Sequence, residues 1–479
     1  MTTSYSRIKS LVDSTPNDAL PSPSALLRAA STIPSSLPAT GLGDAATEAH
    51  LLTDLVPGFN GPKTSANYYG FVTGGTFPVA EFADCVVTAF DQNVQVHLPD
   101  QSVSTIVEDR ALGMLVQLLD LGRGWEGKTF TTGATGANIL GLACGREAVV
   151  SKRLEGLGEL GGVGEMGLLT ACLKAGIRKI QVLTAMGHSS LYKASSVVGL
   201  GRAAVRDIGS GVDHPWKMDL DLLQQELQQE KEGVVSIVVL SAGEVNTGRF
   251  STDGFLEMQK IRDLCDKYGA WLHVDGAFGI FARSLPRTPE FGALRNAVSG
   301  LELADSITGD CHKMLNVPYD CGFFLTRSSA TLSSVFQNPN AAYLSSGPST
   351  IPSPLNIGLE NSRRFRALPV YAVLLAYGRE GLAEMFARQV RLARGISRFL
   401  HGSPDYTLLP HYPLPVSDDE KLASGHEFEN THIIVLFRAK DEKVNDELIA
   451  WDIPLLTATL QKMGPLVCDT VSQASNDNI

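Results

Sequence analysis

A lysine in a setting suited to a nucleophile occurs at position 313. Lys313 lies in the segment Gly-Asp-Cys-His-Lys-Met-Leu-Asn (309–316), between small and apolar residues 301–308 and the apolar run 322–325. Burial between such segments disfavours the charged form of an amine. A neutral amine attacks aldehydes, so this setting predicts covalent chemistry on a carbonyl group. A lysine beside a strand is more often simply exposed to solvent. The rest of the chain has to decide whether Lys313 is catalytic or solvent-exposed.

Three other apolar segments also end in small polar clusters. The expected strands and the clusters that follow them are 179–184 with 185–190, 234–240 with 241–248, and 271–274 with 275–278. Segments with helical and strand patterns alternate here, which predicts a mostly parallel sheet covered by helices on both faces. Ligands bind beyond the carboxyl ends of such strands, so we expect these clusters and the segment 310–313 to share one cleft.

A glycine- and threonine-rich turn provides a further expected binding element. Gly133, Ala134 and Thr135 follow the β-prone piece 128–131 and open an alanine- and leucine-rich helix. Free N–H groups at a helix N-terminus favour a phosphate. The turn matches neither common nucleotide motif, so the sequence favours a single phosphate over a nucleotide, and an ordinary strand–helix turn is the alternative.

Together these clusters supply the parts that an aldehyde cofactor with a phosphate tail requires, which implies pyridoxal 5'-phosphate. Lys313 would form the imine, and Asp275 would pair with the protonated ring nitrogen. His188 would stack on the ring. The expected remaining contacts are Gly133, Ala134 and Thr135 to the phosphate, Asn246 to the ring substituents, and His312 to the phosphate or the substrate.

Composition limits the class of protein. The chain has 479 residues, 44% of them hydrophobic and 19% charged, with a net charge of −11. A globular protein of two or three domains is expected, and the acidic balance favours neither nucleic acid nor an anionic membrane as partner. The seven cysteines follow no metal-binding pattern, and neither a signal peptide nor a membrane span is expected. These features predict a cytoplasmic protein without a metal site.

At this point the chain resembles the group II pyridoxal-phosphate decarboxylases, the family of aromatic-amino-acid, tyrosine, histidine and glutamate decarboxylases. The stretches that carry the resemblance are Tyr69–Phe71, Thr132–Thr135, His188–Ser190, His273–Ala277, Asp310–Lys313 and Arg363–Arg366. The resemblance implies fold type I of the pyridoxal-phosphate enzymes, an α/β fold with a small C-terminal α+β domain. It also implies a homodimer with active sites at the interface, and loss of the α-carboxylate of an L-amino acid as CO2.

The resemblance assigns further residues. Ala277 matches the small residue under the ring, and the segment Asp310–Lys313 adds Asp310 and His312 to the expected cofactor contacts. Tyr343 matches the tyrosine that protonates the carbanion after decarboxylation. Relatives that form aldehydes oxidatively tend to have phenylalanine there, so Tyr343 favours simple decarboxylation.

The expected organisation has three parts. Residues 1–100 form an N-terminal arm and dimer-contacting segment, of which residues 1–45 are a loosely packed arm with one short helix at 25–30. Residues 101–365 form the large cofactor-binding domain. Residues 366–479 form the small domain, with a strand at 431–437 and a divergent or shortened end after residue 453.

Three functions stay open at this stage. Decarboxylation of an L-amino acid is favoured, and the aromatic loop at 68–71 makes an aromatic substrate the first expectation. Acidic and diamino substrates are the alternatives. The second function is other chemistry on the same cofactor, such as an aldehyde synthase or a carbon–sulfur lyase. The third is a catalytically impaired homologue that acts as a binding or dimerisation partner.

Overall fold

The computed structural model describes residues 4–15, 18–339, 350–410 and 428–444. Its contacts divide the chain into two compact units, one of residues 77–438 and one of residues 1–76 with 439–479, and each is described by itself. Tyr343 and the closing segment 453–479 lie outside the described residues. The predicted three-part division stays a prediction.

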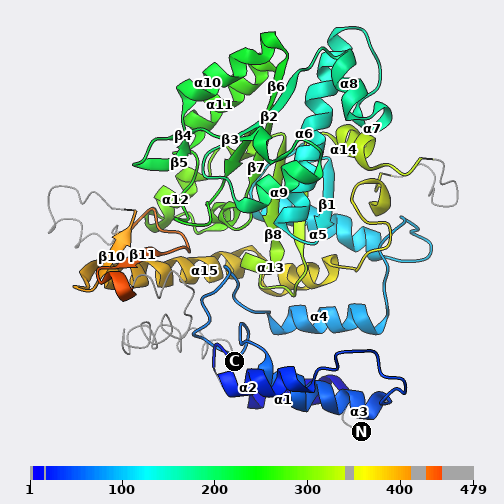
Figure 1. The fold of residues 1–479 in the computed structure, drawn as a ribbon, viewed down its shortest axis with the longest axis vertical. Coiled ribbons are helices and arrows are strands. Elements are labelled where there is room, and N and C mark those ends of the chain that lie inside the picture. Colours follow the sequence, from blue (N-terminus) through cyan, green and yellow to red (C-terminus); the bar gives the residue numbers. More distant parts are fainter. Residues whose placement is uncertain (1–3, 16–17, 340–349, 411–427, 445–479) are drawn as a thin grey trace. The chain divides into compact units, whose positions relative to one another are not determined.

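A seven-stranded sheet forms the centre of the unit 77–438, in the order β1-β9-β8-β7-β6-β2-β3 (Figure 1). Its strands are β1 Gly127–Thr131, β2 Lys179–Thr184, β3 Val205–Asp207, β6 Val234–Ser241, β7 Trp271–Asp275, β8 Ser306–Asp310 and β9 Gly322–Thr326. The neighbours from β3 to β8 run parallel. Only β9 runs antiparallel to its two neighbours, β8 and β1. The predicted α/β class with a mostly parallel sheet is confirmed.

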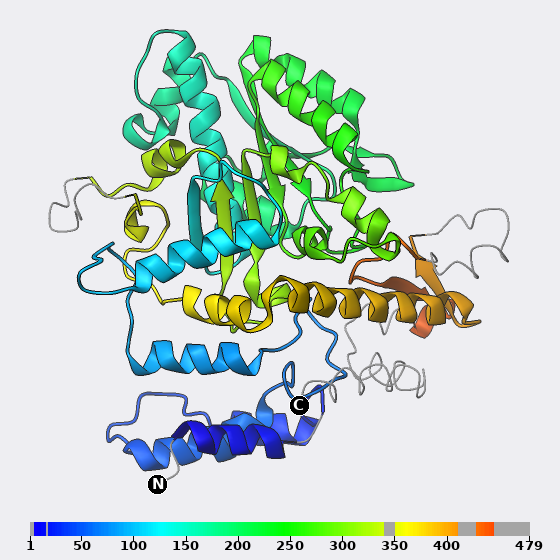
Figure 2. The ribbon, with the colours of Figure 1, turned by 180° about the vertical axis from the view of Figure 1, so that it is seen from behind.

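Helices of the same unit surround this sheet (Figures 1 and 2). They are α4 Pro78–Ala89, α5 Ser104–Leu118, α6 Ala134–Gly156, α7 Val163–Met166, α8 Leu168–Lys174, α9 Ser189–Val197, α10 Leu220–Gln228, α11 Phe255–Tyr268, α12 Gly292–Ala297, α13 Cys311–Met314, α14 Ser329–Phe336 and α15 Ala367–Gly402. Strand β6 reads Val-Val-Ser-Ile-Val-Val-Leu-Ser and is buried along its whole length. A strand rich in β-branched residues and buried along its length needs cover on both faces. Helices α6 and α10 contact β6, and α11 contacts its neighbour β7.

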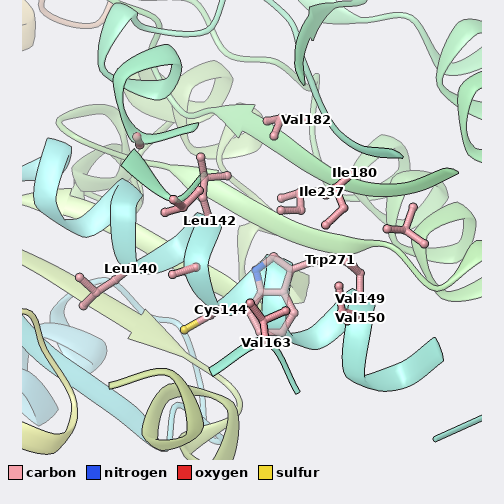
Figure 3. Packing of buried hydrophobic residues seen from close by; sticks show 14 of the residues in the cluster. Leu140, Leu142, Cys144, Val149, Val150, Val163, Ile180, Val182, Ile237 and Trp271 are labelled. Carbon is pink, nitrogen blue, oxygen red and sulfur yellow. The ribbon is translucent and has the colours of Figure 1, made fainter. Parts of the chain in front are cut away.

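The main apolar core lies where α6 packs on the sheet. Figure 3 shows Leu142, Val149 and Val150 of α6 gathered with Trp271 and Ile237 of the strands. Close packing depends here on glycine, because a Cβ at Gly145 would lie 2.9 Å from Cδ1 of the Trp271 ring. The backbone of α6 therefore approaches β7 more closely than a helix with side chains at these positions would.

Several local expectations need correction. Residues 1–45 include the helices α1 Ser4–Ser14 and α2 Pro23–Thr32, followed by α3 Asp44–Ala49, because α1 and α2 each carry an apolar stripe that the Ser/Pro-rich composition hid. The glycine-rich segment predicted as a loop at 155–168 contains α7.

The small sheets also refine the expectations. The predicted strand at 431–437 is wrong in its bounds, since β11 spans Leu436–Ala439 and pairs with β10 Tyr406–Leu409. Strands β4 Gly209–Ser210 and β5 His214–Met218 form another two-stranded sheet. Among the described residues, no helix is both long and apolar enough to cross a membrane.

Candidate active site

A cavity of about 270 Å³ opens at the carboxyl ends of the central strands. Nine of the residues that the sequence singled out line it: Gly133, Ala134, Thr135, His188, Asp275, Ala277, Asp310, His312 and Lys313. They come from four separate connections after β1, β2, β7 and β8. The expectation that successive strand ends share one cleft is therefore confirmed in the structure.

Lys313 lies on the short helix α13, which begins directly after β8. Its side chain is 20% exposed, and its Nζ lies 3.2 Å from Oδ2 of the almost fully buried Asp310. The same Nζ lies 5.7 Å from the centre of the Phe278 ring. His312 Nε2 is 3.7 Å from that Asp310 oxygen. The amine is thus held between a carboxylate and an aromatic ring at the wall of the cavity.

Asp310 also connects the lysine to the start of helix α6. Its Oδ1 accepts a hydrogen bond from the backbone N–H of Ala134, with an N–O distance of 2.6 Å. The preceding Gly133 leaves this corner open, because a Cβ there would lie 3.3 Å from Cε1 of His312. A helix N-terminus, a lysine and a histidine therefore converge on the Asp310 carboxylate, and residues 133–136 at this helix N-terminus also line the cavity.

Asp275 ends strand β7 with a side chain that is nearly buried, at 8% exposure of the residue. Oδ2 accepts a hydrogen bond of 2.8 Å from Nδ2 of Asn138, and Oδ1 accepts one of 3.2 Å from the backbone N–H of Ala277. Both carboxylate oxygens are thus engaged by donors from the protein, and the residue still lines the cavity.

Two fully buried residues behind Asp275 were not expected to take part in the site. Asn138 of α6 and His273 of β7 lie with Oδ1 and Nε2 3.0 Å apart. Burial lowers the pKa of His273 to about 4, against the opposing effect of Asp275. An asparagine inside an apolar helix and a histidine inside an apolar strand were the available signals, since buried polar groups require partners.

His188 lies at the N-terminal cap of α9. Its Nδ1 lies 2.7 Å from Oγ of Ser190 and accepts from the backbone N–H of Ser190 at 3.1 Å. These contacts fix the plane of the imidazole, which lines the cavity.

Asn246 differs from the other predicted residues because it does not line the cavity. Its backbone N–H and Nδ2 both donate to Oε2 of Glu244, at 2.8 and 3.1 Å. Glu244 itself lines the cavity, as do Ser241 and Phe278, none of which sequence reasoning assigned. The side-chain amide of Asn246 is therefore occupied within its own turn.

The donor set fits pyridoxal phosphate. The cavity offers a lysine amine, a buried carboxylate, an imidazole and a helix N-terminus. Gly243 helps to shape it, since its φ is +81° and a Cβ there would meet Cε2 of Phe278 at 2.8 Å. Among the described residues no group of three or more His, Cys, Asp or Glu is arranged to hold a metal ion.

Comparison with known proteins also points to pyridoxal phosphate as the cofactor. The conserved domain of pyridoxal-dependent decarboxylases matches residues 82–411. The chain is 28% identical over 342 residues to L-2,4-diaminobutyrate decarboxylase of Acinetobacter baumannii, covering 70% of this chain and 63% of that protein. It is 26% identical over 374 residues to tryptophan decarboxylase 1 of Oryza sativa subsp. japonica, covering 76% and 68%. The chain thus spans less than two thirds of the length of the first of these relatives.

Solved structures share the fold. Oryza sativa tryptophan decarboxylase with pyridoxal phosphate and tryptamine superimposes with a TM-score of 0.72 at 20% identity, covering 98% of this chain and 96% of that one. Rhodiola rosea 4-hydroxyphenylacetaldehyde synthase gives a TM-score of 0.70 at 17% identity, covering 95% and 86%. At such identities the likeness establishes the fold alone.

Proposed function

The chain belongs to the family of pyridoxal-dependent decarboxylases, whose cofactor is pyridoxal phosphate, and we propose that it removes the α-carboxylate of an L-amino acid as CO2 and releases the amine. One observation carries this proposal. Lys313, Asp275 and the N-terminus of α6 come from three distant parts of the sequence and line a single cavity.

The residues that would hold the cofactor follow from their positions. Lys313 would bind its aldehyde, Asp275 its ring nitrogen, and residues 133–135 its phosphate. When bound, pyridoxal phosphate supplies a ring that accepts the electron pair left at Cα as CO2 departs.

Residues of the chain perform the remaining tasks. His188, with its ring plane fixed by Ser190, is placed to pack on a flat ligand. The Phe278 ring presents an apolar wall close to Lys313, which excludes water from the reacting carboxylate. Asp310 Oδ2 forms an ion pair with the lysine Nζ at 3.2 Å and so holds this amine at the cavity wall. Protonation at Cα by Tyr343 stays a prediction, since this residue lies outside the described ones.

For the substrate we propose an aromatic L-amino acid. The sequence contains the aromatic segment 68–71, and Phe278 and Val245 form an apolar part of the cavity wall. A specific observation favours a second candidate, L-2,4-diaminobutyrate. Glu244 lines the same cavity and its carboxylate attracts a second ammonium group, and a relative carries that name. The homodimer with interfacial sites and the cytoplasmic location stay predictions.

The test combines cofactor binding with product analysis. Purified protein is expected to show a visible absorbance band that borohydride bleaches, and to release CO2 and amine in equal amounts from one of L-tryptophan, L-tyrosine, L-2,4-diaminobutyrate or L-aspartate. Borohydride reduction should attach the cofactor covalently to the wild-type protein and raise its mass. This mass increase should be absent in Lys313→Ala, while the circular dichroism spectrum of the variant stays that of the wild type. Aldehyde with H2O2 or ammonia in place of amine would support the aldehyde synthase alternative. Absence of a band after addition of the cofactor would overturn the proposal.

A further inference from the structure

Asp275 is the end of a continuous hydrogen-bond chain that crosses the interior of the sheet. The indole Nε1 of Trp271 lies 2.9 Å from Oγ of Ser306, which lies 2.8 Å from Nδ1 of His273. Nε2 of His273 lies 3.0 Å from Oδ1 of Asn138, whose Nδ2 lies 2.8 Å from Asp275 Oδ2. We call these five residues the aspartate chain.

The two ends of the aspartate chain fix the direction of every bond in it. An indole N–H only donates, so Ser306 Oγ accepts from Trp271 and gives its own proton to His273 Nδ1. An ionised carboxylate only accepts, so the Asn138 amide presents its NH2 to Asp275 and its oxygen to His273. His273 therefore carries its proton on Nε2. All hydrogen bonds of the aspartate chain can thus form with His273 neutral. A neutral imidazole agrees with the lowered pKa of His273.

The packing of α6 on β7 is shaped to admit this chain. A Cβ at Gly141 would lie 2.4 Å from Cε1 of His273, and one at Gly145 would lie 2.9 Å from Cδ1 of Trp271. The helix therefore leaves space for both rings at positions one turn apart. Asn138, His273 and Ser306 are each fully buried, so water has no access to compete for these bonds.

A second branch ties the chain to His188. Nδ2 of Asn138 is also 3.5 Å from Oγ of Ser190, which in turn lies 2.7 Å from Nδ1 of His188. Asn138 thus contacts Asp275, the carboxylate expected at the ring nitrogen of the cofactor. It also contacts Ser190, which orients His188, the imidazole expected at the face of that ring.

We propose that Asn138 and His273 are positioning residues which hold Asp275 as a fixed, acceptor-only carboxylate toward the cofactor, with Asn138 as the branch point that also sets His188. This inference rests on the proposed function, since it concerns the same cavity. It assigns a task at the site to two residues that do not line the cavity themselves.

The test uses Asn138→Leu, which keeps the shape of the side chain and removes its donor, and Asn138→Asp, which keeps the shape and replaces the donor by an acceptor. Two quantities are measured for each folded variant: the dissociation constant of pyridoxal phosphate, by fluorescence titration, and the pH midpoint of the bound cofactor's absorbance band. Loss of a hydrogen bond to a charged group should weaken binding about tenfold or more in Asn138→Leu. Asn138→Leu should also shift the pH midpoint of the bound cofactor. Asn138→Asp should weaken cofactor binding further and shift this midpoint by a larger amount.

A matched control lies in the same sheet. Gln181 of β2, the second strand from β7 in the sheet order, is a fully buried amide whose Nε2 donates to Ser236 Oγ at 3.2 Å. Ser236 lies near the start of β6, whereas Asp275 pairs with Ser241 at the end of that strand. Gln181→Met removes a buried amide of similar type. The dissociation constant of this variant should stay within about twofold of wild type and its pH midpoint should be unchanged, since only the bonds at Asp275 reach the cofactor.

The outcomes separate this inference from the function it rests on. Wild-type protein that binds no cofactor would refute the proposed function. Wild-type protein that binds normally, with Asn138→Leu showing an unchanged midpoint and affinity, would refute the inference alone. Should both Asn138 variants fail to fold, Ser306→Ala decides the matter, because Ser306 is three hydrogen bonds away from Asp275 in the aspartate chain. It should move the midpoint in the same direction by a smaller amount, and no movement would refute the inference.

Discussion

Two buried histidines of the same unit differ in how they are bonded. His273, in β7, has both ring nitrogens within hydrogen-bond distance of polar partners and leads to Asp275. His432, which follows Phe428–Thr431, has no hydrogen-bond partner at either nitrogen among the described residues. Its ring instead stacks on Phe278, with centroids 6.1 Å apart and planes 11° apart. Equal burial therefore serves two purposes, a directed polar chain at one place and aromatic packing behind the cavity wall at the other.

The same substitution at both positions should produce the largest contrast. His273→Phe leaves Oδ1 of Asn138 without its His273 partner and leaves Oγ of Ser306 without an acceptor for its proton, and it adds volume to a tight site. We expect the free energy of unfolding to fall by about 4 kcal/mol. His432→Phe keeps a ring against Phe278 and removes two unpaired nitrogens, so a change of about 1 kcal/mol or less is expected. Urea unfolding of both variants measures this, and equal losses would show that the bonding of His273 adds nothing beyond its packing.

Both histidines should make the folded protein less stable at acidic pH. Burial lowers the pKa of His273 to about 4 and, together with Arg394, that of His432 to about 3. The unfolded chain takes up a proton at each near pH 6.5 while the folded chain does not, so stability is full above pH 6.5 and falls as pH decreases. Each histidine should account for about 3 kcal/mol of loss by pH 4.

Unfolding free energies at pH 7, 6, 5 and 4 measure this dependence. In His432→Phe the free energy of unfolding should fall less steeply between pH 6 and pH 4 than in the wild type, because one of the two histidines that take up a proton on unfolding is absent. An unchanged slope would mean that His432 is protonated in the folded protein.

A smaller effect should come from the glycines of the helices. Gly141→Ala places a methyl group against the His273 ring and should cost about 1–3 kcal/mol. Gly113 of α5, where a Cβ would meet nothing within 4 Å, is the matched position. Gly113→Ala should stabilise the protein by about 0.5–1 kcal/mol, because alanine favours the helix. Melting temperatures of the two variants decide, and a Gly141→Ala protein as stable as wild type would show that helix α6 can shift away from β7.

Much of the site could be predicted from the sequence because its residues sit at strand ends. Asp275 and Lys313 follow apolar strands that run parallel, and parallel strands bring such ends to one edge. Asn138 could not be found in this way, since it lies inside a helix and its partners are 135 and 137 residues away. The antiparallel insertion of β9 between β1 and β8 was equally hidden, because strand order depends on tertiary packing and not on the local pattern.

The lysine and the aspartate of the site also differ in how far apart in the chain their partners lie. Lys313 sits between β8 and β9, which pair antiparallel as neighbours in the sequence, Asp310 opposite Gly322. Asp275 receives its donor from a residue 137 positions earlier. Closing a long loop costs more entropy than closing a short one, so contacts of this second kind are expected to form late in folding. During refolding, the segment around Lys313 should gain protection from hydrogen exchange before the segment around Asn138, and the ability to bind the cofactor should appear with the later of the two.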